Sequence, residues 1–279
     1  MRPRTTIAWP ETPDAAGDAG PATGRFALSE GGEVEVAAWG RPPHAAPTLL
    51  LLHEGLGCVA LWRDFPVRLA VATGCGVVAY SRLGYGASSP VALPLPLTHM
   101  VDEARSVLPQ LVRAIGPATF SLFGHSDGAT IVAHYLTGDA DPRLAAAVLI
   151  APHFFVEASN LAAIRKTREA YEAGDLRARL AKYHGDNVDG AFYGFAETWC
   201  DPAFRDWDMR YEIERWHHPV LFIQGRDDPY GSSAQAAAAG HSPCCRVAEL
   251  DGCAHAPHLE QPRATLDLIT TFLAREAAP

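Results

Sequence analysis

The sequence has little cysteine for its length, and the cysteines lack the spacing of a metal site or a redox motif. Six of the 279 residues are cysteines, and none of them form a C-x-x-C pair: Cys58, Cys75, Cys200, Cys244, Cys245 and Cys253. Free thiols are expected, the adjacent Cys244 and Cys245 included, as in a reducing compartment. The twelve histidines show no H-E-x-x-H or similar pattern, so no metal ion is expected.

Basic charge and long apolar runs are also scarce. Lysine and arginine total 23 against 32 acidic residues, a net charge of −9, and no basic stripe is visible, which argues against nucleic-acid binding. No apolar run approaches the roughly 20 residues of a membrane-spanning helix. Residues 1–6 lead into Pro, Glu and Asp rather than an apolar signal segment. We therefore expect a cytoplasmic protein with a small-molecule substrate, no cofactor and no membrane or nucleic-acid partner; its oligomeric state stays open.

The length allows one large domain or two ordinary ones, and the pattern along the chain has to decide. Residues 1–23 are rich in Pro, Ala, Gly and Asp, which predicts a flexible N-terminal arm. Residues 25–36 alternate apolar and polar side chains around Gly31-Gly32, which predicts a β-hairpin.

Beyond Pro47 the sequence contains continuous apolar runs, which are typical of strands covered on both faces of a mostly parallel sheet. The runs are 48–52, 76–80, 119–123, 144–150 and 219–223, with a weaker edge strand at 246–250. Apolar residues at helical spacing lie between them, for example in 100–115, where Pro109 predicts a kink. This alternation predicts an α/β fold with a doubly wound sheet.

The alternation stops between residues 156 and 216. This stretch is helical in character, highly charged and without a convincing buried strand, and the α/β pattern resumes at Pro219. We therefore expect one core, formed by 24–155 and 217–279, with 156–216 as an insertion between two strands of the same sheet.

A motif of the form G-x-S-x-G occupies residues 124–128, directly after an apolar strand and before the helical stretch 129–136. A serine on such a sharp strand-to-helix turn has strained backbone angles, and side chains at the two glycine positions would collide with neighbouring chain. The helix N-terminus also directs backbone N–H groups toward the serine. Ser126 is therefore the candidate nucleophile.

A serine nucleophile needs a base and a carboxylate that orients the base. Asp227 and Asp228 follow the run 219–223, and His255 and His258 follow the strand at 246–250. The carboxyl ends of parallel strands meet at one edge of an open sheet, so one aspartate and one histidine are expected near Ser126.

These motifs, in this order, resemble the α/β-hydrolase superfamily over residues 24–276. The resemblance implies an α/β-hydrolase fold with an N-terminal hairpin and a helical cap at 156–216. In that family the acid follows the strand-end glycine by three residues and the histidine follows a small glycine-containing turn. The resemblance therefore selects Asp228 over Asp227 and His255 over His258.

An oxyanion hole needs two preorganised N–H donors. One is expected to be the backbone amide of Asp127, the residue after the nucleophile. The loop 53–57 resembles the family's oxyanion loop, which implies Gly55 as the second donor. Glu54 departs from the family pattern, and a carboxylate there would oppose an oxyanion unless neutralised. We expect Glu54 to pair with Arg82; the alternative is that Glu54 binds substrate.

The insertion holds ten of the chain's 25 aromatic residues: Tyr171, Tyr183, Phe192, Tyr193, Phe195, Trp199, Phe204, Trp207, Tyr211 and Trp216. Most are expected to form a core between short cap helices. One to three are expected to line an apolar pocket.

The resemblance implies a serine hydrolase that cleaves a small to medium, largely apolar carboxylic ester through an acyl-enzyme. A carbon–carbon hydrolase, a lactonase, a thioesterase or a prolyl aminopeptidase would fit the same triad, and a haloperoxidase side activity is compatible with it. Glu54 favours the peptidase among these, because a carboxylate can bind a free amino terminus. The alternative of a different class is a non-catalytic ligand receptor.

Overall fold

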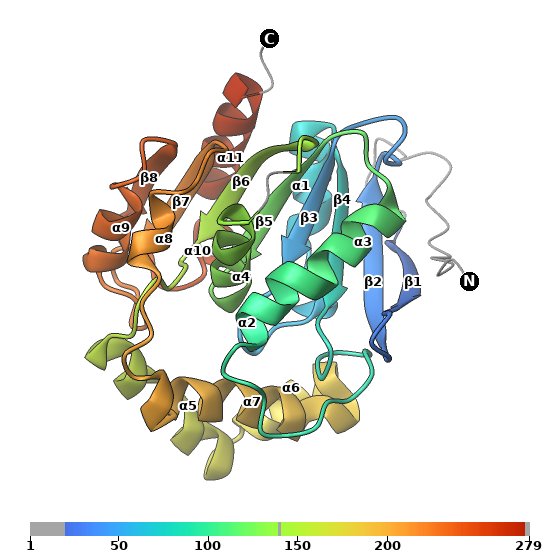
Figure 1. The fold of residues 1–279 in the computed structure, drawn as a ribbon. Helices are drawn as coiled ribbons and strands as arrows, with labels where there is room; N and C mark the ends of the chain where they lie inside the picture. The colour runs from blue at the N-terminus through green and yellow to red at the C-terminus, as the bar shows by residue number, and fades with distance from the viewer. Residues whose placement is uncertain (1–19, 139–140, 277–279) are drawn as a thin grey trace.

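A computed structural model describes residues 20–138 and 141–276, which form a sheet of eight strands flanked by helices (Figure 1). The strand order is β1-β2-β4-β3-β5-β6-β7-β8. Strand β2 runs antiparallel to β1 and β4, and all other neighbours are parallel. The predicted doubly wound, mostly parallel sheet with an N-terminal hairpin is confirmed.

The strands lie close to the predicted apolar runs. Their bounds are β1 (Ala22–Ala27), β2 (Glu33–Gly40), β3 (Thr48–Leu52), β4 (Gly76–Ser81), β5 (Phe120–His125), β6 (Leu144–Ile150), β7 (Val220–Gly225) and β8 (Cys245–Leu250). In the hairpin, Ala27 pairs with Glu33. Strand β1 begins inside the predicted arm 1–23, and the arm's first 19 residues lie outside the described residues.

The α-helices lie between or beside the strands. They are α1 (Phe65–Thr73), α2 (His99–Asp102), α3 (Leu108–Ile115), α4 (Asp127–Leu136), α5 (Ala158–Glu172), α6 (Leu176–His184), α7 (Val188–Cys200), α8 (Arg210–Ile213), α9 (Ser233–Ala239), α10 (Pro257–Glu260) and α11 (Pro262–Glu276). Short helical segments are η1 (Val59–Trp62), η2 (Glu103–Val107), η3 (Gly185–Asn187) and η4 (Pro202–Phe204).

Pro109 lies in the helical stretch before β5, part of which is not α-helical. The segment η2 between α2 and α3 is π-helical, and Pro109 lies in the first turn of α3. A proline is tolerated there because the first N–H groups of a helix have no partner within the helix.

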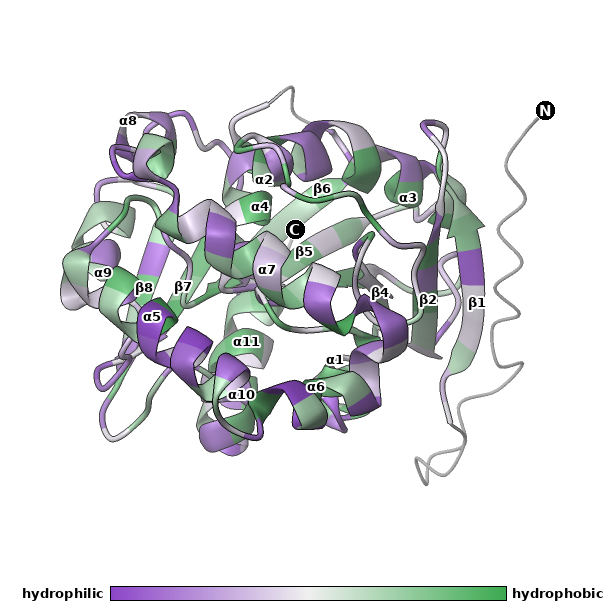
Figure 2. Ribbon diagram, turned by 90° about the horizontal axis from the view of Figure 1, so that it is seen from below, coloured by the Kyte–Doolittle hydropathy of each residue, from purple (hydrophilic) through white to green (hydrophobic). Residues whose placement is uncertain are grey.

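The sheet is apolar because it is buried on both faces. In β3, Leu50 and Leu52 contact the core shared with α3 and α4, whereas Leu49 and Leu51 contact the core shared with α1 and α11. Successive side chains of a strand point to opposite faces, so continuous apolar runs are required. Figure 2 shows the strands mostly in hydrophobic colours, while the outer helices also carry hydrophilic residues.

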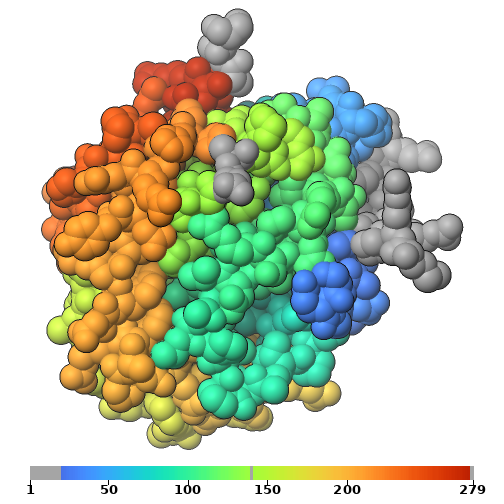
Figure 3. Space-filling model, viewed as in Figure 1, coloured from blue at the N-terminus to red at the C-terminus, as the bar shows by residue number. Residues whose placement is uncertain are grey.

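The helices of the insertion lie below the carboxyl ends of the strands (Figure 1), and in the space-filling view they close this edge of the molecule (Figure 3). The Tyr171 and Phe192 rings stack with centroids 3.6 Å apart. Phe204 and Trp207 stack at 5.2 Å, and the Trp199 ring packs edge-on against both of them. Aromatic contacts therefore hold these short helices together.

Within residues 20–138 and 141–276, no helix is both long and apolar enough to cross a membrane. The same residues contain no group of three or more His, Cys, Asp or Glu side chains that could hold a metal ion. All six cysteines are free thiols.

Candidate active site

Ser126 occupies a strained turn between β5 and α4. Its backbone angles are φ 52° and ψ −118°, a region that residues with a Cβ rarely adopt. Its N–H donates a hydrogen bond to the Ile150 carbonyl at 2.8 Å, which ties the turn to β6. Strained residues of this kind persist where the surrounding structure over-determines them, and they cluster at functional sites.

The two glycines of the motif are required by lack of space. A Cβ on Gly128 would lie 2.1 Å from the Leu52 carbonyl oxygen, and a Cβ on Gly124 would lie 2.4 Å from the Ala129 Cα. Neither glycine has a positive φ. Both positions therefore need glycine because backbones approach closely, as the sequence argument expects.

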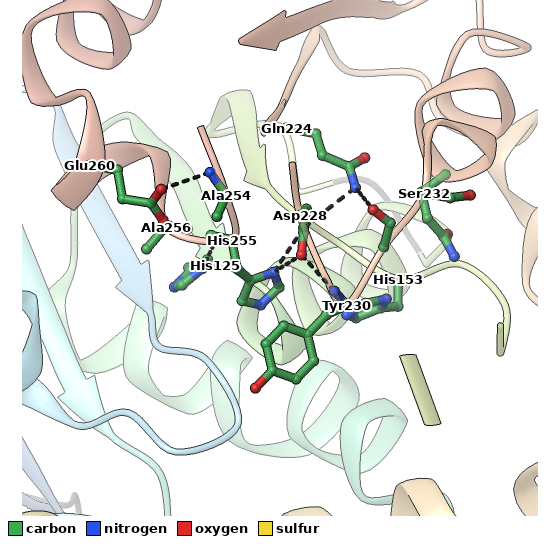
Figure 4. A network of polar contacts seen from close by, with 12 residues as sticks. His125, His153, Gln224, Asp228, Tyr230, Ser232, Ala254, His255, Ala256 and Glu260 are labelled. Carbon is green, nitrogen blue, oxygen red and sulfur yellow. Dashed lines mark hydrogen bonds and ion pairs between the residues drawn. The ribbon is translucent and has the colours of Figure 1, made fainter. Parts of the chain in front are cut away.

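Asp228 and His255 lie in direct contact beyond β7 and β8 (Figure 4). His255 Nδ1 is 2.9 and 2.8 Å from the two carboxylate oxygens of Asp228. The backbone N–H of Tyr230 also donates to Asp228, at 2.8 Å. Burial raises the pKa of Asp228, but the hydrogen bond and charge of His255 outweigh burial, so the pKa lies below its ordinary value.

The loop that carries His255 is held at three points. Glu260 accepts hydrogen bonds from the backbone N–H groups of Ala254 and Ala256, at 2.7 and 2.9 Å (Figure 4). His125 Nε2 lies 2.8 Å from the His255 carbonyl oxygen and donates to it. Burial holds the pKa of His125 well below its ordinary value, so the ring is neutral.

Asp227 and His258 have surroundings that differ from those of Asp228 and His255. Ser126 and His255 line the same cavity. Among the described residues, no hydrogen bond joins Ser126 Oγ to His255. Asp227 is exposed. His258 is buried, with ring centroids 5.1 Å from those of both Trp62 and Phe65, and burial lowers its pKa to about 3.

Gly55 and Asp127 face the cavity beside Ser126. Asp127 is the first residue of α4, and N–H groups in a first turn have no acceptor within the helix. A Cβ on Gly55 would lie 2.4 Å from the Phe195 ring and 3.0 Å from Asp127 Oδ2. The loop passes so close to the inserted helix α7 that a side chain at position 55 would require the Phe195 ring to move.

The expected pairing of the Glu54 and Arg82 side chains is wrong. Arg82 Nη2 donates instead to the backbone carbonyl of Glu54, at 2.9 Å. The Glu54 carboxylate accepts the backbone N–H of Leu56, at 2.8 Å. The guanidinium therefore holds the main chain of the loop, and the carboxylate remains at the cavity.

The cavity has about 620 Å³ of empty space, part of which is open to solvent. Its lining residues are Glu54, Gly55, Leu56, His125, Ser126, Asp127, His153, Asn160, Ile164, Phe195, Trp199, Tyr230, His255 and Ala256. Of the ten inserted aromatics, Phe195 and Trp199 lie in this wall.

The sequence analysis missed three residues that hold the site. Trp199 Nε1 donates to Asp127 Oδ1 at 3.0 Å, which links the insertion to the core. His125 and Tyr230 hold His255 and Asp228. The Asp228–Tyr230 contact is an Asx turn, and its two-residue spacing was a usable signal. Nothing in the sequence distinguished Trp199 from the other inserted aromatics.

The sequence was also compared with models of known protein families. Residues 49–268 match the model of the alpha/beta hydrolase family. The chain belongs to this family. It is an enzyme of the hydrolase class, with esterases among its relatives.

Relatives of known or assigned activity cover most of the chain. A non-heme chloroperoxidase of Streptomyces lividans is 26% identical over 252 residues, covering 77% of this chain and 87% of the relative. A bifunctional esterase/perhydrolase of Acinetobacter calcoaceticus is 26% identical over 237 residues, covering 74% and 82%. The crystal structure of an esterase from a Rhodococcus species aligns with a TM-score of 0.69 and 19% identity, covering 90% of this chain and 98% of the esterase.

Proposed function

We propose that the protein is a serine hydrolase that cleaves small to medium, largely apolar carboxylic esters through an acyl-enzyme. The observation that carries the proposal is the hydrogen bond between Asp228 and His255, because His255 lines the same cavity as the strained Ser126. Leu56, Ile164 and Phe195 supply apolar wall for the substrate. The esterase among the relatives supports this reaction class.

In the first half-reaction, the Ser126 hydroxyl attacks the ester carbonyl while His255 Nε2 removes the hydroxyl proton. The low pKa of Asp228 keeps this carboxylate ionised, so it stabilises the imidazolium that forms. The backbone N–H groups of Gly55 and Asp127 donate to the oxyanion. His255 then protonates the leaving alcohol, and the acyl group stays on Ser126.

In the second half-reaction, His255 Nε2 takes a proton from water, which attacks the acyl-enzyme carbonyl. The same two N–H donors stabilise the second oxyanion, and the proton returns to Ser126 as the acid leaves. His125 and Glu260 act on this chemistry indirectly, because they hold the loop on which His255 lies.

The test is covalent labelling with a fluorophosphonate, followed by peptide mapping and turnover of p-nitrophenyl butyrate. We expect the adduct on Ser126, and S126A should lose the label and at least about 1,000-fold in kcat, as expected for a nucleophile. The exposed Ser106 supplies the control variant S106A, which should keep both. An adduct elsewhere, or an S126A protein with wild-type turnover, would refute the proposal.

A further inference from the structure

The Asp127 side chain has one carboxylate oxygen without a partner. Asp127 is 1% exposed, and its Oδ1 accepts the hydrogen bond from Trp199. Its Oδ2 is buried and has no hydrogen-bond partner. Oδ2 lies beside Gly55, on the wall where the oxyanion donors are placed. By contrast, both carboxylate oxygens of Asp228 are hydrogen-bonded.

A second carboxylate lies on the same wall. Glu54 accepts one backbone N–H, and burial raises its pKa to about 7. Arg82 is bound to the Glu54 carbonyl instead, and no ion pair within 4.0 Å joins Arg82 to either carboxylate. The residues that line the cavity include no lysine or arginine. Among the described residues, no ion pair therefore neutralises either carboxyl group directly, and the buried Arg82 acts on both only through its more distant charge.

A ligand that meets these oxygens must donate hydrogen bonds, and positive charge on the donor strengthens them. A buried carboxylate oxygen without a donor is costly, and a charge-assisted hydrogen bond to it is about twice as strong as a neutral one. Asn160 Oδ1, in the same wall, is also buried without a partner. A primary ammonium group has three donors and no acceptor, which matches this set of acceptors.

Catalysis gives a second reason for a cation at this position. A carboxylate beside the oxyanion hole opposes the negative charge that develops in the transition state. A substrate cation bound to Asp127 removes this opposition at the moment of reaction. An ester without such a cation leaves the opposition in place.

We propose that the preferred substrate is an aminoacyl ester, whose ammonium group binds to the Asp127 carboxylate with Glu54 and Asn160 as further acceptors. This rests on the proposed serine-hydrolase function and specifies its acyl group. Asp127 supplies both the oxyanion N–H and the carboxylate, so the ammonium is placed on the carbon next to the scissile carbonyl. Ile164 and Phe195 offer apolar surface to the acyl side chain.

The test compares L-phenylalanine ethyl ester with ethyl 3-phenylpropanoate, which differ only by the ammonium group. kcat/KM is measured at pH 6.5 for the wild type and D127N, each relative to p-nitrophenyl butyrate. We expect the wild type to prefer the amino ester by about 30-fold or more, and D127N to lower this ratio at least tenfold, as for a hydrogen bond between charged groups. An α-ammonium also activates the ester chemically, so the change in the ratio is the readout.

The exposed Asp227 supplies a matched control, because D227N makes the same change outside the cavity and should leave the ratio unaltered. The inference is overturned if D127N keeps the wild-type ratio, if D227N lowers it equally, or if p-nitrophenyl butyrate is cleaved while the amino ester is not. If no ester is cleaved and Ser126 takes up no fluorophosphonate, the proposed function fails and this inference fails with it.

Discussion

The α/β core and the inserted helices both contribute walls to one cavity, but they constrain their residues very differently. In the core, Gly128 lies against the main chain of Leu52, and a Cβ there would stand 2.1 Å from a carbonyl oxygen. In α7 of the insertion, a Cβ on Gly190 would meet nothing within 4 Å. Main-chain contacts cannot yield by changing a rotamer, whereas side-chain contacts can. At these two positions, residue identity is therefore dictated closely in the core and loosely in the insertion.

The same contrast explains how the parts of the site are held. Asp228, His255 and Ser126 lie at strand ends whose positions the sheet determines. Phe195 and Trp199 reach the cavity from the inserted helix α7, where the Trp199 ring packs against Phe204 and Trp207. The proposed catalytic residues thus come from the sheet, and part of the pocket wall comes from the inserted helices.

The largest expected effect belongs to a core residue. D228N keeps the size of the side chain but removes the charge that stabilises the His255 imidazolium, so kcat should fall about 10³- to 10⁴-fold with the fold intact. The measurement is p-nitrophenyl butyrate turnover together with a thermal unfolding curve. D227N should match the wild type in both. A loss below tenfold in D228N would place the acid elsewhere.

The second prediction tests the contrast between the two glycines directly. G128A forces a Cβ against the Leu52 main chain and should lower the free energy of unfolding by about 3 kcal/mol or more. G190A should raise it by roughly 0.5–1 kcal/mol, because alanine favours a helix and the site is open. Urea unfolding measures both. Equal effects at the two positions would remove the distinction between core and insertion.

Glu54 gives the third prediction, a dependence of stability on pH. Burial raises its pKa from the ordinary 4.5 to about 7 in the folded protein, so folding takes up a proton between these values. Its contribution is complete below about pH 4.5 and is lost as pH rises to about 7, on the order of 2–3 kcal/mol. E54Q should lack this decline. Urea unfolding at pH 5 and pH 7.5 measures the free energy of unfolding of both proteins. An equal change between the two pH values in wild type and E54Q would contradict the prediction.

The smallest expected effect concerns the hydrogen bond that joins the insertion to the core. W199F removes the Nε1 donor to Asp127 and should cost roughly 1–3 kcal/mol of unfolding free energy, because a second carboxylate oxygen loses its partner. The control is W207F, since the Trp207 ring packs against the same cluster and its Nε1 has no such bond. If both variants lose equal stability, ring volume rather than the hydrogen bond holds the insertion.

The sequence predicted the features that follow from the spacing of apolar residues and from close packing of the main chain. Continuous apolar runs locate strands such as β3 because both faces of the sheet are buried. The spacing of Gly124, Ser126 and Gly128 predicts the turn because the constraint is local. The kink expected at Pro109 stays a prediction: Pro109 lies in the first turn of α3, directly after the π-helical segment η2.

The charged and aromatic contacts of the site were less predictable. Arg82 was expected to meet the Glu54 carboxylate, and it meets the Glu54 carbonyl instead. The carboxylate and the backbone carbonyl belong to the same residue, Glu54. Which of the two faces the guanidinium depends on how the loop turns. Likewise, ten inserted aromatics have similar chemistry, and only packing selects Phe195 and Trp199 for the cavity.

The sequence by itself determined the order of strands and helices, the strained turn at Ser126 and the few residues from which an acid and a base could come. Short-range sterics and the period of burial act along the chain, so the chain displays them. Only the tertiary structure shows that His255 contacts Asp228, and that Asp127 Oδ2 is buried without a donor. Those contacts depend on atoms distant in sequence, and burying a charged group without a partner costs free energy.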